Sequence, residues 1–84
     1  MDYRDEAPDI IKGFLTYHET IKAHSRATVD EYYLDLRNFF RFLKIERGIL
    51  PRSTELDDIS IKDIDLDFVK SVTLTEFYDY LSFL

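Results

Sequence analysis

Four residues in the segment KAHSRAT have side chains of the kind that bind phosphate groups. They are Lys22, Ser25, Arg26 and Thr28. Lysine and arginine supply positive charge, and the two hydroxyl groups supply hydrogen-bond donors. Ser25 is also a suitable N-cap for the helical pattern that follows, so the segment lies at the positive end of a predicted helix. This combination predicts a contact with the phosphate backbone of DNA.

Three further basic residues lie along the same predicted helix, at Arg37, Arg41 and Lys44. At about 100° per residue they fall on one flank of the helix together with Arg26. Beside this flank runs a broad apolar stripe of Val29, Tyr33, Leu36, Phe40 and Leu43. The basic flank would extend the contact along the DNA backbone or into the major groove.

The same residues also have a purely structural interpretation. Ser25 and Thr28 would only cap the helix, and Arg26 would pair with Asp30 at the i, i+4 spacing. The basic flank would then be a solvated face, with Arg37 as an ion-pairing residue within the fold. Taken alone, the residues favour this second interpretation.

The elements that would position these residues are predicted to be helical, which makes the fold class all-α. We expect helices from about Pro8 to Ile21 or Lys22, from Ser25 to Gly48, near Leu66–Lys70, and from Leu74 to the end. Gly48 lies where a left-handed C-cap residue belongs, and Asp65 is a suitable N-cap. Thr73 and Glu76 have the spacing of a capping box.

The segment ISIKDI at 59–64 is ambiguous, because its alternating apolar residues favour a strand. A single strand would have no partner in this chain. We therefore predict extended chain through Ile64 rather than a sheet. The last helix has no stop signal before Leu84, and we expect the fold to be cut before its final helix.

Composition limits the chain to a single domain over residues 1–84. Hydrophobic residues make up 45% of it, which is enough for a core, and the absence of cysteine excludes disulfides and Cys-ligated metal. No apolar run approaches the roughly 20 residues of a membrane span, and the acidic N-terminus is unlike a signal peptide. We expect a cytoplasmic protein without membrane contact.

The net charge of −6 is unevenly distributed. Residues 22–52 carry seven Lys and Arg against four Asp and Glu, whereas residues 53–84 carry two against eight. Because charges are screened beyond about 8–10 Å, a local basic surface can still attract phosphate. The overall acidity supports an alternative, an acidic helical module that binds proteins and not DNA.

No arrangement of residues indicates catalysis or a cofactor. The acidic residues at 55–67 lack the order of ligands that a calcium-binding loop requires. His18 and His24 have no cysteine or clear carboxylate partner for a metal, and His18 falls on an apolar helix face, where a packed histidine is expected. The chain alone is therefore not expected to be an enzyme.

The long helix carries a series that resembles a known family. The pattern Ser25-x-x-Thr28-x-x-x-Tyr32-x-x-Asp35-Leu36-Arg37-x-Phe39-Phe40-x-Phe42-Leu43 is similar to the core-binding domain of tyrosine recombinases. Phe14-Leu15-x-Tyr17 and LTEFYDYLSFL resemble the helices before and after it in that domain. The resemblance extends from about residue 8 to residue 84.

This resemblance implies a small SAM-like bundle of three to four helices that forms half of a C-shaped clamp on double-stranded DNA. In that family the catalytic arginines and the nucleophilic tyrosine belong to a separate C-terminal domain, so none of the tyrosines here is expected to be a nucleophile. The implied partners are DNA, that catalytic domain and other recombinase protomers, in a bacterial or phage-encoded protein. With the resemblance, a phosphate contact by residues 22–28 becomes the favoured interpretation.

Overall fold

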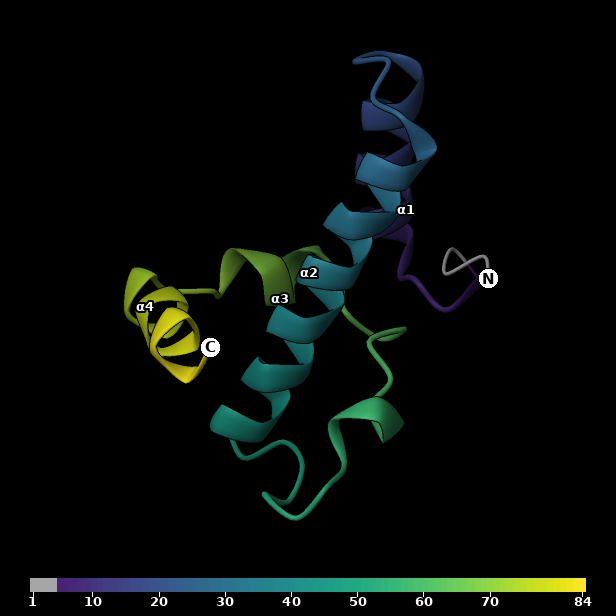
Figure 1. Ribbon diagram of the computed structural model, residues 1–84. Helices are drawn as coiled ribbons and strands as arrows, with labels where there is room; N and C mark the ends of the chain where they lie inside the picture. The colour runs from purple at the N-terminus through teal and green to yellow at the C-terminus, as the bar shows by residue number, and fades with distance from the viewer. Residues whose placement is uncertain (1–4) are drawn as a thin grey trace.

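The computed structural model describes residues 5–84, and every regular element in that range is helical (Figure 1). The all-α prediction is therefore confirmed. The elements are α1 (Asp9–Thr20), α2 (Arg26–Glu46), the short 3-10 helix η2 (Leu56–Asp58), α3 (Leu66–Lys70) and α4 (Leu74–Phe83). Their bounds lie within two residues of the predicted ones, and only η2 was not predicted.

Helix α2 is the longest element, and both of its ends are capped as the sequence predicts. The Ser25 hydroxyl accepts a hydrogen bond from the backbone N–H of Thr28 at 3.2 Å. At the other end Gly48 has a φ of +71°, and the N–H of Ile49 donates to the carbonyl of Lys44 at 2.9 Å. Glycine is favoured there because a left-handed backbone carries no steric cost without a Cβ.

Helix α1 packs beside the first half of α2 as its hairpin partner (Figure 1). Ile11 and Leu15 on α1 are buried together with Val29 and Tyr33 on α2. The second half of α2 continues the same core through Phe40, Phe42 and Leu43. The apolar stripe predicted for the long helix is thus the side on which the core is built.

A segment without regular structure, residues 59–64, covers the lower half of α2. Ile59, Ile61 and Ile64 are buried, with 2–3% of their surface exposed. No strand pairs with this segment among residues 5–84. Two of its carbonyls instead accept hydrogen bonds from side chains of α2, as described below. The prediction of extended chain without a sheet is confirmed for residues 59–61. It is wrong for residues 62–63, which form a turn in which the N–H of Ile64 donates to the carbonyl of Ile61 at 3.0 Å.

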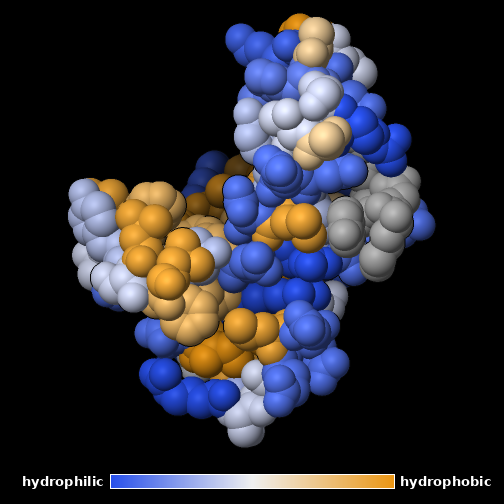
Figure 2. All heavy atoms as spheres, in the orientation of Figure 1, coloured by the Kyte–Doolittle hydropathy of each residue, from blue (hydrophilic) through white to orange (hydrophobic). Residues whose placement is uncertain are grey.

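Helix α4 begins with the predicted capping box, in which Thr73 and Glu76 bond each other's backbone N–H groups. None of its residues is fully buried. Tyr80 packs against Phe39 and Phe42 of α2, with ring centroids 5.2 and 5.3 Å away. Its other apolar side chains are largely exposed, and Figure 2 shows apolar atoms gathered over this helix. They are Leu74, Phe77, Tyr78, Leu81, Phe83 and, just beyond the helix, Leu84.

The difference between α2 and α4 can be tested with two identical substitutions. Leu43 has 0% of its surface exposed and Leu74 has 65%. We expect Leu43→Ala to lower the free energy of unfolding by about 2–5 kcal/mol, because it removes buried contacts and leaves a cavity. Leu74→Ala should change it by less than about 0.5 kcal/mol. Urea unfolding of both variants measures this, and equal losses would contradict the assignment of the core.

Candidate nucleic-acid interface

The four residues predicted to bind phosphate lie together at the tip of the α1–α2 hairpin. Lys22, Ser25 and Arg26 are exposed, and Thr28 is half-buried in the first turn of α2. The turn that presents them contains Ala23 in a left-handed conformation, with a φ of +56°. The tip is the upper end of the molecule in Figure 1.

The contacts of the structural interpretation are also present at this tip. Besides the cap, the Ser25 hydroxyl donates to the Thr28 hydroxyl at 3.0 Å. Arg26 and Asp30 lie 3.9 Å apart, with 57% and 42% of their side chains exposed. An ion pair this exposed contributes at most about 1 kcal/mol, so it does not compete strongly with a phosphate ligand. Capping and ligand binding are therefore compatible here.

Stacked aromatic rings support the turn from below, which the sequence did not predict. His24 stacks on His18 with ring centroids 5.4 Å apart, and both meet the Tyr32 ring edge-on. The N–H of His24 also donates to the carbonyl of His18 at 3.0 Å. His18 is half-buried, as expected for a packed histidine. These contacts fix the backbone that leads into Ser25.

Arg37 does not extend this exposed surface but binds a carboxylate from the N-terminal segment. Its Nη1 donates to Glu6 Oε1 at 2.7 Å, and the Tyr33 hydroxyl donates to the same oxygen at 2.9 Å. The hydrogen bond from Arg37 lowers the pKa of Glu6, while burial, reinforced by the bond to Glu6, raises the pKa of Tyr33. The ion-pairing role considered for Arg37 is thus present.

Arg41 and Lys44 are buried, with 7% and 6% of their surface exposed. Arg41 Nε donates to the carbonyl of Ile59 at 2.8 Å, and Lys44 Nζ donates to the carbonyl of Ser60 at 2.7 Å and to the Asp63 carboxylate. Burial lowers the pKa of the Arg41 guanidinium, and the bond from Lys44 lowers the pKa of Asp63. The interpretation of this flank as a solvated face is therefore wrong for both residues, because the segment 57–63 folds back over them.

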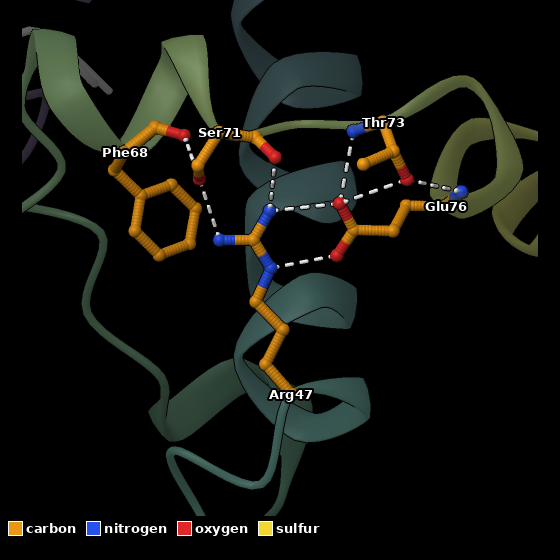
Figure 3. A network of polar contacts seen from close by, with 5 residues as sticks. All are labelled: Arg47, Phe68, Ser71, Thr73 and Glu76. Carbon is orange, nitrogen blue, oxygen red and sulfur yellow. Dashed lines mark hydrogen bonds and ion pairs between the residues drawn. The ribbon is translucent and has the colours of Figure 1, made fainter.

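A polar network that the sequence analysis did not predict joins the end of α2 to α4 (Figure 3). Arg47 binds both oxygens of the Glu76 carboxylate, with Nε 2.6 Å from Oε2 and Nη2 2.8 Å from Oε1. Its Nη1 donates to the Ser71 hydroxyl at 2.8 Å, and the guanidinium lies 4.7 Å from the centroid of the Phe68 ring. The capping box revealed Glu76, but nothing in the sequence identified Arg47 as its partner.

The Arg47–Glu76 pair lowers the pKa of the Glu76 carboxylate. The hydrogen bonds from Arg47, helped by the backbone N–H of Thr73, lower the pKa of Glu76 to about 2. Both side chains are about four-fifths covered, at 23% and 20% exposure. The pair therefore holds the start of α4 against α2 at neutral pH, where Glu76 is charged.

Within residues 5–84, no three His, Asp or Glu side chains come together in a way that could hold a metal ion. None of the helices over the same residues combines the length and the apolar character needed to cross a membrane.

Comparison with known proteins finds a relative among the recombinases. The chain is 46% identical over 76 residues to Tyrosine recombinase XerC from Caldanaerobacter subterraneus subsp. tengcongensis. The alignment covers 90% of this chain but 22% of that recombinase, so the chain spans about a fifth of its relative's length. No protein-family model matches the chain, and no solved structure matches it. The identity supports a relation to the tyrosine recombinases.

The Arg47–Glu76 pair predicts a specific dependence of stability on pH. Because the pKa of Glu76 is about 2 in the folded protein and ordinarily 4.5, the pair stabilises above about pH 4.5 and loses its effect as the pH falls towards 2. We expect Glu76→Gln to lower the free energy of unfolding by about 1–3 kcal/mol at pH 7. That difference should disappear near pH 2.

Urea unfolding at a series of pH values measures this effect, with Asp79→Asn as the control. Asp79 is an exposed carboxylate on the same helix, and glutamine at position 76 still allows the capping box. A loss in Glu76→Gln that is no larger than in Asp79→Asn would show that the pair does not hold α4.

Proposed function

We propose that this chain is the core-binding domain of a tyrosine recombinase and forms half of a C-shaped clamp on double-stranded DNA. The supporting observation is the hairpin tip, where Lys22, Ser25, Arg26 and Thr28 are gathered at the capped start of α2. The 46% identity to a tyrosine recombinase supports the same proposal. Binding would begin with a DNA backbone phosphate at this tip.

The chemistry of the tip suits a phosphate in three ways. The first-turn N–H groups of a helix have no acceptor within the helix, and the helix dipole is positive at this end. The Lys22 and Arg26 side chains are exposed and cationic. The hydroxyl groups of Ser25 and Thr28 can donate to phosphate oxygens if they rotate so that the hydrogen bond between them is broken. A phosphate would therefore meet charge and hydrogen-bond donors together.

Glu19, Asp30 and Glu31 lie near this contact, but most acidic residues of the C-terminal part of the chain lie far from it. Eight of the acidic residues lie in residues 53–84, and the tip lies at 22–28. The tip and the loop that carries most of these carboxylates are at opposite ends of α2, which at 1.5 Å per residue is roughly 30 Å long (Figure 1). This exceeds the screening length of about 8 Å at physiological salt.

In this proposal the domain positions DNA and performs no chemistry itself. The catalytic residues would belong to a second domain, and the other partners would be further recombinase protomers in a bacterial or phage-encoded system. No metal or cofactor is needed for such a role. The domain would act in the cytoplasm, where its DNA is.

The exposed apolar face of α4 favours a second candidate function, an acidic module that binds proteins. Five residues of α4 and the adjacent Leu84 expose between 44% and 78% of their surface. Apolar surface of this kind often marks a site of contact with another protein or domain. Salt separates the two functions, because release of counterions makes DNA binding strongly salt-dependent, whereas apolar docking is not.

Reversal of one charge at the tip tests the proposed contact. We expect Arg26→Glu to weaken binding to a duplex about tenfold at low salt and to reduce the dependence on salt, because one phosphate contact is lost. Fluorescence anisotropy with labelled duplex DNA at several salt concentrations measures both quantities.

The matched control is Arg52→Glu, at a residue whose side chain is 78% exposed in the loop after α2. It makes the same change in net charge far from the tip. If the two variants lose affinity equally, the effect is one of total charge and the tip is not the contact site.

A further inference from the structure

Arg37 and Arg41 of α2 line a pocket that the Glu6 carboxylate of the same chain enters. Tyr33 and Arg37 both donate to Glu6 Oε1, at 2.9 and 2.7 Å. Arg41 lines the same cavity, and its charge also acts on Glu6. The cavity has a volume of about 200 Å³ and is otherwise lined by residues 57–61. The arrangement is an anion site with an acid from the chain bound in it.

Two of the donors, Tyr33 and Arg41, are held in place independently of that acid. Tyr33 has 1% of its surface exposed, and Arg41 is fixed by its bond to the carbonyl of Ile59 at 2.8 Å. Arg37 follows Tyr33 by one turn of α2, so both side chains lie on the same face. A pocket built from a core tyrosine and a buried arginine would keep its shape if Glu6 left.

Glu6 itself is placed so that its side chain can leave without unfolding the segment. The next two residues are anchored, because Ala7 has 0% of its surface exposed and Pro8 is fully buried. The Glu6 side chain, in contrast, is 39% exposed. Rotation about its side-chain bonds would therefore open the pocket while the backbone at 7–8 stays in place.

We propose that Tyr33, Arg37 and Arg41 form a binding site for a phosphate group, and that the Glu6 carboxylate occupies this site and competes with the ligand. Arginine binds phosphate oxygens and carboxylate oxygens with the same donor geometry, which is why one can replace the other. In DNA binding, which is the part that rests on the proposed function, a backbone phosphate displaces Glu6. Arg37 and Arg41 then become DNA contacts only in the opened form.

The acidic residues beside the pocket set an upper limit to its affinity. Asp57 lies 3.8 Å from Arg41 and Asp58 also lines the cavity. The Asp57 side chain is fully exposed, so it can turn into water when an anion arrives. We therefore expect millimolar binding of free phosphate, about −4 kcal/mol, and tighter binding only when other contacts hold the phosphate in place.

The direct test is an NMR titration of the arginine Nε–H signals with inorganic phosphate. In Glu6→Ala we expect the Arg37 and Arg41 signals to shift and to saturate in the millimolar range. In the unmodified protein they should shift at least threefold less at the same phosphate concentration. The control Glu31→Ala removes one acidic group from an exposed position on α2 and should behave like the unmodified protein.

A second variant keeps the test valid if Glu6→Ala does not fold, as judged by circular dichroism. Glu6→Gln keeps the size and a neutral acceptor, and its arginine signals should shift more than in the unmodified protein. Adding Arg37→Gln to either variant should remove the response. Arginine signals that respond alike in the Glu6 variants and the unmodified protein would overturn the site.

A measurement of duplex DNA binding by the same variants identifies the source of the phosphate. If the site takes DNA phosphates, Glu6→Ala should raise duplex affinity at least threefold more than Glu31→Ala does. A phosphate response without this gain would support the anion site but assign it to small phosphate ligands. The proposed DNA function fails separately, if no variant binds duplex DNA while the arginine signals still respond to phosphate.

Discussion

The structure depends on how the backbone of segment 59–64 finds hydrogen-bond partners without a neighbouring strand. Buried carbonyl groups need hydrogen-bond partners, and an unpaired one costs about 1–3 kcal/mol. Arg41 and Lys44 supply them by donating to the carbonyls of Ile59 and Ser60. Their aliphatic portions are buried with the core while their charged ends meet the loop. This arrangement lets Ile59, Ile61 and Ile64 close the lower half of α2 without a sheet.

The same arrangement divides the positive charge of α2 between two tasks. At the lower end, Arg41, Lys44 and Arg47 hold the loop and α4. At the upper end, Arg26 forms an exposed, weak ion pair with Asp30, and Lys22 is exposed on the turn before it. In a chain with a net charge of −6, Lys22 and Arg26 thus stay at the surface, whereas Arg41 and Lys44 are buried and bind the loop.

Local signals in the sequence predicted most of the helices, since caps and periodicity act within a few residues. Ser25, Gly48, Asp65 and the Thr73–Glu76 box all lie at the ends where they were expected. The sequence could not predict which basic residues would be buried. Arg26, Arg41 and Lys44 share a flank of the helix. Loop 57–63 folds over Arg41 and Lys44 but leaves Arg26 exposed. Arg47 meets Glu76 from 29 residues away, and no periodicity carries such information.

A titration of the isotopically labelled chain with duplex DNA at low salt tests the central claim most directly. The account predicts amide shifts concentrated from Lys22 to Thr28, weak binding, and reversal by added salt, because phosphate contacts release counterions. Shifts confined to α4 and insensitive to salt, or no shifts at millimolar DNA, would contradict it. Either of these results would show that the hairpin tip is not a DNA contact and would favour the acidic protein-binding module.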